Sequence, residues 1–181
     1  MIKNIYVFSK AVIRRIIEDQ NYFLNLNSDW ALISIYGSPT DPAIKNKKEE
    51  QELKDKGCSK ILYECFGDYT KTDLEYFQTN YTTAANHVKV ITIEQAKEIV
   101  HFIDSVNLQD TTENLVIHCH AGISRSGAVG LFACRYLKLH KKNLVELNKI
   151  HSNTYVLDLL SKVSGIKKSY KLFWKKLSSY E

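Results

Sequence analysis

The stretch His118–Ser126 constrains the fold more than any other part of the sequence, because Cys119 and Arg125 stand at the two ends of a five-residue loop. The apolar run Leu115–Ile117 precedes this loop and is short enough to be a buried strand. The apolar segment Gly127–Leu137 follows it and is long enough to be a buried helix. A strand, a tight loop and a helix point backbone N–H groups and the positive end of the helix dipole at one spot. The sequence therefore predicts a phosphate-binding loop.

Several residues of this loop suit the chemistry of a phosphoryl group. A helix N-terminus and nearby positive charge lower a cysteine pKa into the range of roughly 3.5 to 7.5, which would make Cys119 a thiolate. Gly122 allows a turn without a Cβ, and the planar guanidinium of Arg125 matches two phosphoryl oxygens. Ser126 is placed to donate a hydrogen bond to the sulfur, and His118 to steady the thiolate from behind. The backbone amides expected to bind phosphate are those of His120, Ala121, Gly122, Ile123, Ser124 and Arg125.

The pattern H-C-x-x-G-x-x-R-S resembles the signature of the cysteine-based protein tyrosine phosphatase superfamily. The form H-C-H-A-G-I-S-R-S-G is most similar to its dual-specificity branch, and the match is close over residues 115–137. The resemblance implies a hydrolase that forms a phosphocysteine, needs no metal or cofactor, and acts on a phosphorylated protein or a small phosphomonoester. His120 and Ile123 stand where lysines would indicate a phosphoinositide phosphatase, which disfavours that substrate.

A general acid must protonate the leaving oxygen. The resemblance implies an aspartate after a strand that precedes the signature, and Asp68 takes that place just after an expected strand. Asp73 is the rival. However, Thr72-Asp73-Leu74-Glu75 looks like a capping box, which would hold Asp73 as a carboxylate in the first turn of a helix. Since the compact members of the family usually have a shorter chain between acid and nucleophile, residues 70–90 are expected to be an insertion near the pocket.

Three alternatives to this interpretation stay open. The loop could bind phosphate without turning it over. An RNA 5′-phosphatase is the second alternative, because related enzymes with this motif have that activity and Lys168, Lys171 and Lys175 could share one face of the last helix. The third is a metal site at residues 118–120, although an extended segment places Cys119 on the opposite side from the two histidines. Asn153 resembles an asparagine before a late helix of the dual-specificity branch and equally suits an ordinary N-cap.

Composition agrees with one compact enzyme. The 181 residues, 44% of them hydrophobic and 25% charged, suit a single globular domain over residues 1–181. The net charge of +5 favours anionic substrates but is too small and dispersed to indicate nucleic acid. With no apolar run long enough for a signal peptide or a membrane helix, a soluble cytoplasmic protein is expected. The sequence does not indicate the oligomeric state.

Strand-like and helix-like segments alternate along the chain, which predicts an α/β fold with a mostly parallel central sheet, helices on both faces and a helical C-terminal part. Ligands of such sheets bind beyond the carboxyl ends of the strands, where the phosphate loop would lie. Strands are expected at Asn4–Phe8, Ala31–Tyr36, Lys60–Phe66 and Asn114–His118. Helices are expected at Ser9–Asn21, Lys45–Lys56 (as a solvated helix or loop), Gly127–Leu137, Asn143–Ile150, Ser152–Val163 and Lys168–Ser179.

The segment Thr92–Gln95 has the pattern of a capping box, which marks the start of a further helix. The apolar residues expected on the buried face of this helix are Ile93, Ala96, Val100, Ile103 and Val106.

The four cysteines do not form a disulfide framework in a chain of this kind. Cys134 is expected in the core of a helix. Cys65 lies at the carboxyl end of an expected strand, so it could share one end of the sheet with Cys119. An oxidised Cys119 would then be trapped as a reversible disulfide to Cys65. The alternative is that Cys65 is a core residue.

Overall fold

The computed structural model describes residues 1–19, 21–22, 26, 29–80, 89–146 and 149–166. Within them a five-stranded sheet has the order β3-β2-β4-β1-β5, and every pairing is parallel. The strands are β1 (Asn4–Ser9), β2 (Asp29–Tyr36), β3 (Cys58–Cys65), β4 (Thr112–Cys119) and β5 (Leu144–Glu146). The helices are α1 (Lys10–Glu18), α2 (Lys47–Asp55), α3 (Lys71–Asn80), α4 (Ile93–Asn107), α5 (Arg125–Tyr136), the short 3-10 helix η2 (Lys141–Asn143) and α6 (Thr154–Val163). This confirms the predicted α/β class.

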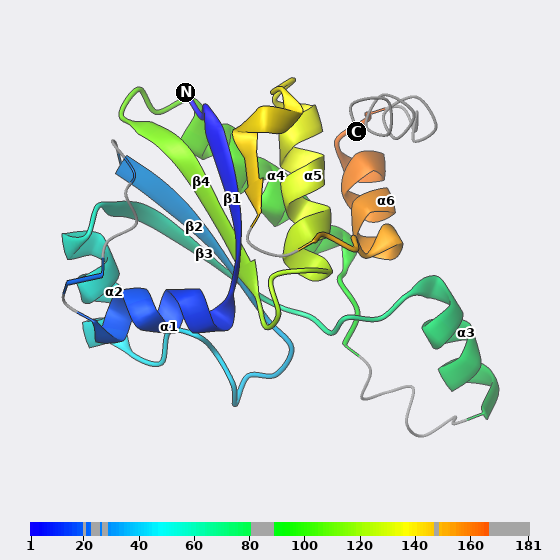
Figure 1. Cartoon of the computed structure of the whole chain (residues 1–181). Coiled ribbons are helices and arrows are strands. Elements are labelled where there is room, and N and C mark those ends of the chain that lie inside the picture. The colour runs from blue at the N-terminus through cyan, green and yellow to red at the C-terminus, as the bar shows by residue number, and fades with distance from the viewer. Residues whose placement is uncertain (20, 23–25, 27–28, 81–88, 147–148, 167–181) are drawn as a thin grey trace.

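Helices cover both faces of the sheet (Figure 1). α1 and α2 lie on one face, whereas α4, α5 and α6 lie on the other. The central strand β4 supplies both cores, because Leu115 and Ile117 point to the side of α4 and α5 while Val116 points to the side of α1. These three side chains are fully buried, and the strand leads directly into the phosphate loop. The nucleophile candidate is therefore fixed at the end of the most enclosed strand.

Several boundaries differ from the sequence-based expectations. The segment 143–150 contains no α-helix where the structure describes it, because Asn143 ends the 3-10 helix η2 and Leu144–Glu146 forms an edge strand beside β1. The open edge of β1 determines the structure of this segment, because pairing with that edge gives a strand. Local helix propensity cannot reveal such a pairing. α5 begins at Arg125, earlier than expected. The expected helix Lys168–Ser179 lies outside the described residues.

The start of α4 agrees with the sequence pattern, while its buried face is shifted. Both hydrogen bonds of the Thr92–Gln95 capping box are present. Ile93 is 44% exposed because it stands at the first position of the helix, and Ile99 is buried in its place. None of the described helices has the length and apolar character needed to cross a membrane.

Candidate active site

The loop between β4 and α5 is shaped by its contact with the end of β1. Ser9 is the register partner of Cys119, and the backbone amide of Lys10 donates to the carbonyl of His120 over 3.1 Å. Gly122 has φ +73°, and a Cβ on it would lie 2.6 Å from Phe8 C and Ser9 N. Glycine is therefore required here both by the left-handed backbone and by the lack of space.

Cys119 sits at the bottom of this loop and is only 2% exposed. Its Sγ lies 3.0 Å from the Oγ of Ser126, in the first turn of α5. Burial raises the pKa of Cys119. Hydrogen bonds from the Ser126 hydroxyl and from the amides of Ser126, Ile123 and Gly122 outweigh burial, so the pKa falls below its ordinary value. The loop thus favours a thiolate, as its sequence predicts.

Arg125 is held at the first position of α5 and is 7% exposed. Its Nη1 donates to the carbonyl oxygen of Phe66 over 2.9 Å, which ties the guanidinium to the segment that follows β3. Its Nε is buried and has no hydrogen-bond acceptor among the described residues. The nearest carboxylate oxygen, Asp68 Oδ2, lies 4.0 Å from this nitrogen.

Asp68 lies against the loop although it is far from it in sequence. Its Oδ1 accepts hydrogen bonds from Ser124 Oγ (2.7 Å) and from Asn153 Nδ2 (2.9 Å). Asn153 is 4% exposed, and its Nδ2 also donates to the carbonyl of Tyr69 over 3.1 Å. Its Oδ1 meanwhile accepts from the amide of Val156 and caps α6. Asn153 is thus the N-cap that the sequence suggests, and it contacts Asp68 as well.

Asp73 stabilises the start of a helix. It lies in the first turn of α3, where its carboxylate accepts from the hydroxyl and the amide of Thr70. These two hydrogen bonds lower the pKa of Asp73 below its ordinary value. The expected capping box at Thr72–Glu75 is wrong by two positions, because Thr70 is the residue that exchanges hydrogen bonds with Asp73.

His118 contacts Cys119 through the backbone. Its Nδ1 lies 3.4 Å from the carbonyl oxygen of Cys119, and its Nε2 shares a 2.8 Å hydrogen bond with Ser34 Oγ. Burial lowers the pKa of His118 to about 4, and the charges of Arg125 and Lys10 add to this effect. The imidazole is therefore neutral at pH 7. It braces two strands and brings no positive charge to the sulfur, so the expected support of the thiolate stays a prediction.

Comparison with known families agrees with this geometry. Residues 43–155, more than half of the chain, match the family model described as protein-tyrosine phosphatase. The chain belongs to the protein-tyrosine phosphatase family. The matched region contains Asp68, Cys119 and Arg125. The chain is thus a cysteine-dependent phosphatase, and a phosphorylated substrate follows from that class.

The crystal structure of Tk-PTP in the active form is similar to this phosphatase with a TM-score of 0.49 and 14% sequence identity, over 90% of this chain and 92% of that one. No curated protein matches the sequence of this phosphatase.

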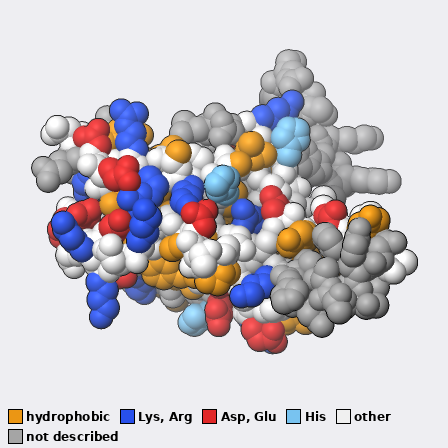
Figure 2. Space-filling view, turned by 90° about the horizontal axis from the view of Figure 1, so that it is seen from below, with side chains coloured by type: hydrophobic (Ala, Val, Ile, Leu, Met, Phe, Trp, Pro, Cys, Tyr) orange, Lys and Arg blue, Asp and Glu red, His pale blue; other side chains and the backbone are white. Residues whose placement is uncertain are grey.

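The face of this phosphatase at the carboxyl ends of the strands carries charges of both signs. Figure 2 views the molecule from the carboxyl ends of the strands, where basic, acidic and histidine side chains gather near the centre. An apolar area adjoins them in the same view.

The expected disulfide between Cys65 and Cys119 is wrong for this phosphatase. Cys65 is the register partner of Tyr36 on β2, and β2 stands between β3 and β4. Two strand spacings of about 4.8 Å separate the two cysteines, well beyond the Cα distance of about 7 Å that a disulfide tolerates. Since Ile35 rather than Tyr36 is in line with Cys119, the two side chains also point to opposite faces.

Proposed function

We propose that this phosphatase is a metal-independent phosphomonoester hydrolase of the dual-specificity type, which works through a phosphocysteine on Cys119 and acts as one domain over residues 1–181. One observation carries the proposal: the Asp68 carboxylate is bonded to Ser124 in the same loop that holds the Cys119 thiol. An acid and a nucleophile at one phosphate loop are what the two steps of such a reaction need. The loop sequence H-C-H-A-G-I-S-R-S-G supports the dual-specificity type.

In the first step the Cys119 thiolate attacks phosphorus, and the S–P bond forms as the P–O bond to the leaving group breaks. Asp68 gives its proton to the leaving oxygen, so that an alcohol or phenol departs. The free Nε–H of Arg125 and the amides of residues 120–125 bind the equatorial oxygens. This electrostatic stabilisation is the largest contribution expected in phosphoryl transfer.

In the second step water attacks phosphorus and passes a proton to the Asp68 carboxylate. The S–P bond breaks, inorganic phosphate leaves, and the electron pair returns to the sulfur. Ser126 Oγ, 3.0 Å from Cys119 Sγ, donates a hydrogen bond to the thiolate as it leaves. The same contact lowers the pKa of Cys119 before the first step.

Asn153 and Ser124 act as positioning residues for the acid. Both donate to Oδ1 of Asp68, which leaves Oδ2 to carry the proton. Because Asn153 is also fixed by the first turn of α6, the acid is held by a second element besides the segment that follows β3. Held in this way, the acid keeps a defined position over the site.

The test is hydrolysis of p-nitrophenyl phosphate, then of phosphotyrosine and phosphothreonine peptides, with a chelator present. Activity toward all three substrates is expected. The Cys119→Ser variant should lose turnover and still bind phosphate, whereas the matched Cys65→Ser control, at a cysteine outside the site, should keep full activity. Loss of wild-type activity with the chelator, or full activity of Cys119→Ser, contradicts the mechanism. Hydrolysis of phosphotyrosine alone contradicts the dual-specificity assignment.

A further inference from the structure

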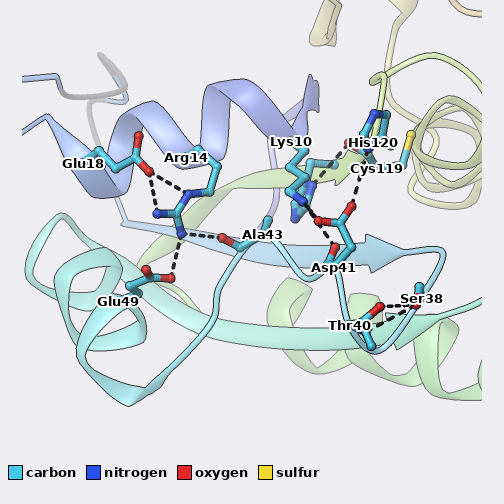
Figure 3. Close-up of polar contacts among 11 residues, drawn as sticks. Lys10, Arg14, Glu18, Ser38, Thr40, Asp41, Ala43, Glu49, Cys119 and His120 are labelled. Carbon is cyan, nitrogen blue, oxygen red and sulfur yellow. Dashed lines mark hydrogen bonds and ion pairs between the residues drawn. The ribbon is translucent and has the colours of Figure 1, made fainter.

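A second group of polar and charged residues lies at the rim of the phosphate loop (Figure 3). Asp41, in the segment that follows β2, forms an ion pair with Lys10 Nζ through Oδ1. Its Oδ2 lies 4.0 Å from Nδ1 of His120, the residue next to the nucleophile. In the close-up Lys10 and His120 both point toward this one carboxylate. We call these three residues the rim cluster.

The rim cluster is rigidly connected to the phosphate loop. The amide of Lys10 donates to the carbonyl of His120, and Ser9, just before Lys10, is in register with Cys119. The backbone of Lys10 is therefore fixed beside the phosphate loop, and its positive charge is close enough to help lower the pKa of His118, after burial and the charge of Arg125.

In the rim cluster the Asp41 carboxylate contacts Lys10 and His120, and all three side chains are at least partly open to solvent. The Asp41 side chain is 59% exposed and that of His120 is 74% exposed, whereas that of Lys10 is 20% exposed. Hydrogen bonding to Lys10, and then its positive charge, keep the pKa of Asp41 below its ordinary value, so this group is a carboxylate. Because the Asp41 carboxylate is open to solvent, its ion pair with Lys10 contributes little stability, and another anion can take the place of Asp41.

We propose that Lys10 and His120 form an accessory subsite for an acidic side chain or second phosphoryl group of a peptide substrate, and that Asp41 occupies the subsite when no substrate is bound. The inference rests on the proposed function. It commits to a peptide because the family to which the chain belongs is that of protein-tyrosine phosphatases. The shared chemistry is a negatively charged oxygen group, which the ammonium of Lys10 and the imidazole of His120 both recognise.

The test compares phosphotyrosine peptides that differ at one neighbouring position, which carries glutamine, glutamate or phosphoserine in turn. For the wild-type protein kcat/KM should rise in that order, by about tenfold from glutamine to phosphoserine, as expected for one charge-assisted hydrogen bond. The Lys10→Met variant should bring this ratio toward one. The Asp41→Asn variant should raise it, because the internal competitor loses its charge.

The Lys3→Met variant is the matched control. Lys3 also forms an exposed ion pair, with Glu113, but at the opposite end of the sheet, so its loss should leave the ratio unchanged. Equal rates for the three peptides in the wild-type protein, or an unchanged ratio in Lys10→Met, overturn the subsite. The assignment to peptides is overturned if kcat/KM is the same for the three peptides but is raised for 5′-triphosphorylated RNA, and if Lys10→Met removes that rise. Hydrolysis of p-nitrophenyl phosphate is measured in parallel. If the proposed function is wrong, this activity is absent too, whereas failure of the subsite alone leaves it intact.

Discussion

Asn153 Nδ2 lies 2.9 Å from Asp68 Oδ1, across 85 positions of the sequence, so the start of α6 is bonded directly to the candidate acid. The same asparagine caps α6 through its Oδ1. Removal of Asn153 therefore has two separable effects: the acid loses a donor, and the helix loses its cap.

The Asn153→Ser variant separates these effects, because serine caps helices about as well as asparagine but cannot reach Asp68 as an amide does. In this variant, hydrolysis of phenyl phosphate should slow by about tenfold, the effect of one hydrogen bond to a charged group. Hydrolysis of p-nitrophenyl phosphate should stay close to the wild-type rate, because its leaving group needs little help from an acid. The pH dependence of kcat for phenyl phosphate should shift as well. Equal slowing of both substrates would show that Asn153 acts only on stability.

The Asp68→Asn variant tests the acid itself. In a single turnover it should slow phosphoryl transfer from phenyl phosphate to Cys119 by roughly 10² to 10⁴, as is typical of general acid catalysis, and slow transfer from p-nitrophenyl phosphate much less. Asp73→Asn is the matched control, since Asp73 is bonded to Thr70 at the start of α3. It should leave both rates unchanged, and the reverse result would move the acid to Asp73.

A glycine pair tests how the loop is packed. Gly122 and Gly165 have nearly the same φ, +73° and +72°. A Cβ at Gly122 would clash, whereas a Cβ at Gly165 would meet no atom of the described residues within 4 Å. Gly165→Ala should cost about 1–2 kcal/mol of unfolding free energy, the usual cost of a left-handed alanine. Gly122→Ala should cost more and abolish activity, as measured by chemical denaturation and phosphate release. Equal costs would mean that the loop relaxes away from β1.

Glu64 gives the phosphatase a pH-dependent stability. Burial raises the pKa of this carboxyl to about 7, with Glu98 adding to the shift and the hydrogen bond from Gln95 opposing it. The folded state therefore keeps a proton that the unfolded state releases from about pH 4.3 upward, so stability should fall as the pH rises through 7. In Glu64→Gln, which cannot ionise, the loss of stability between pH 5 and pH 8 should be smaller, as followed by urea denaturation. An equal loss in both proteins would show that other groups carry the effect.

The sequence predicts the local parts of the site better than the distant ones. The loop is predictable because Cys119, Gly122 and Arg125 lie within one short segment at fixed spacing and each has one chemical role. The role of Asp68 is predicted only from its position after a strand and from the family resemblance. No spacing rule connects it to Ser124, with which it shares a hydrogen bond.

Strand order accounts for the remaining differences. Sequence order suggests that β3 lies close to β4, but β2 stands between them and separates Cys65 from Cys119. The contact of Asp41 with Lys10 likewise depends on the segment after β2 meeting the start of α1, which periodicity does not reveal. Leu144–Glu146 becomes a strand only because the edge of β1 is open to it.

Detection of the covalent intermediate tests the central claim most directly. The Asp68→Asn variant should still transfer phosphate from p-nitrophenyl phosphate to the sulfur but hydrolyse the product slowly, because no carboxylate remains to accept the proton of water. Rapid acid quenching and peptide mass spectrometry should then show one added phosphoryl group on the peptide that contains Cys119. Phosphoryl transfer to another residue, or turnover in which no phosphoenzyme accumulates in this variant, would contradict the account.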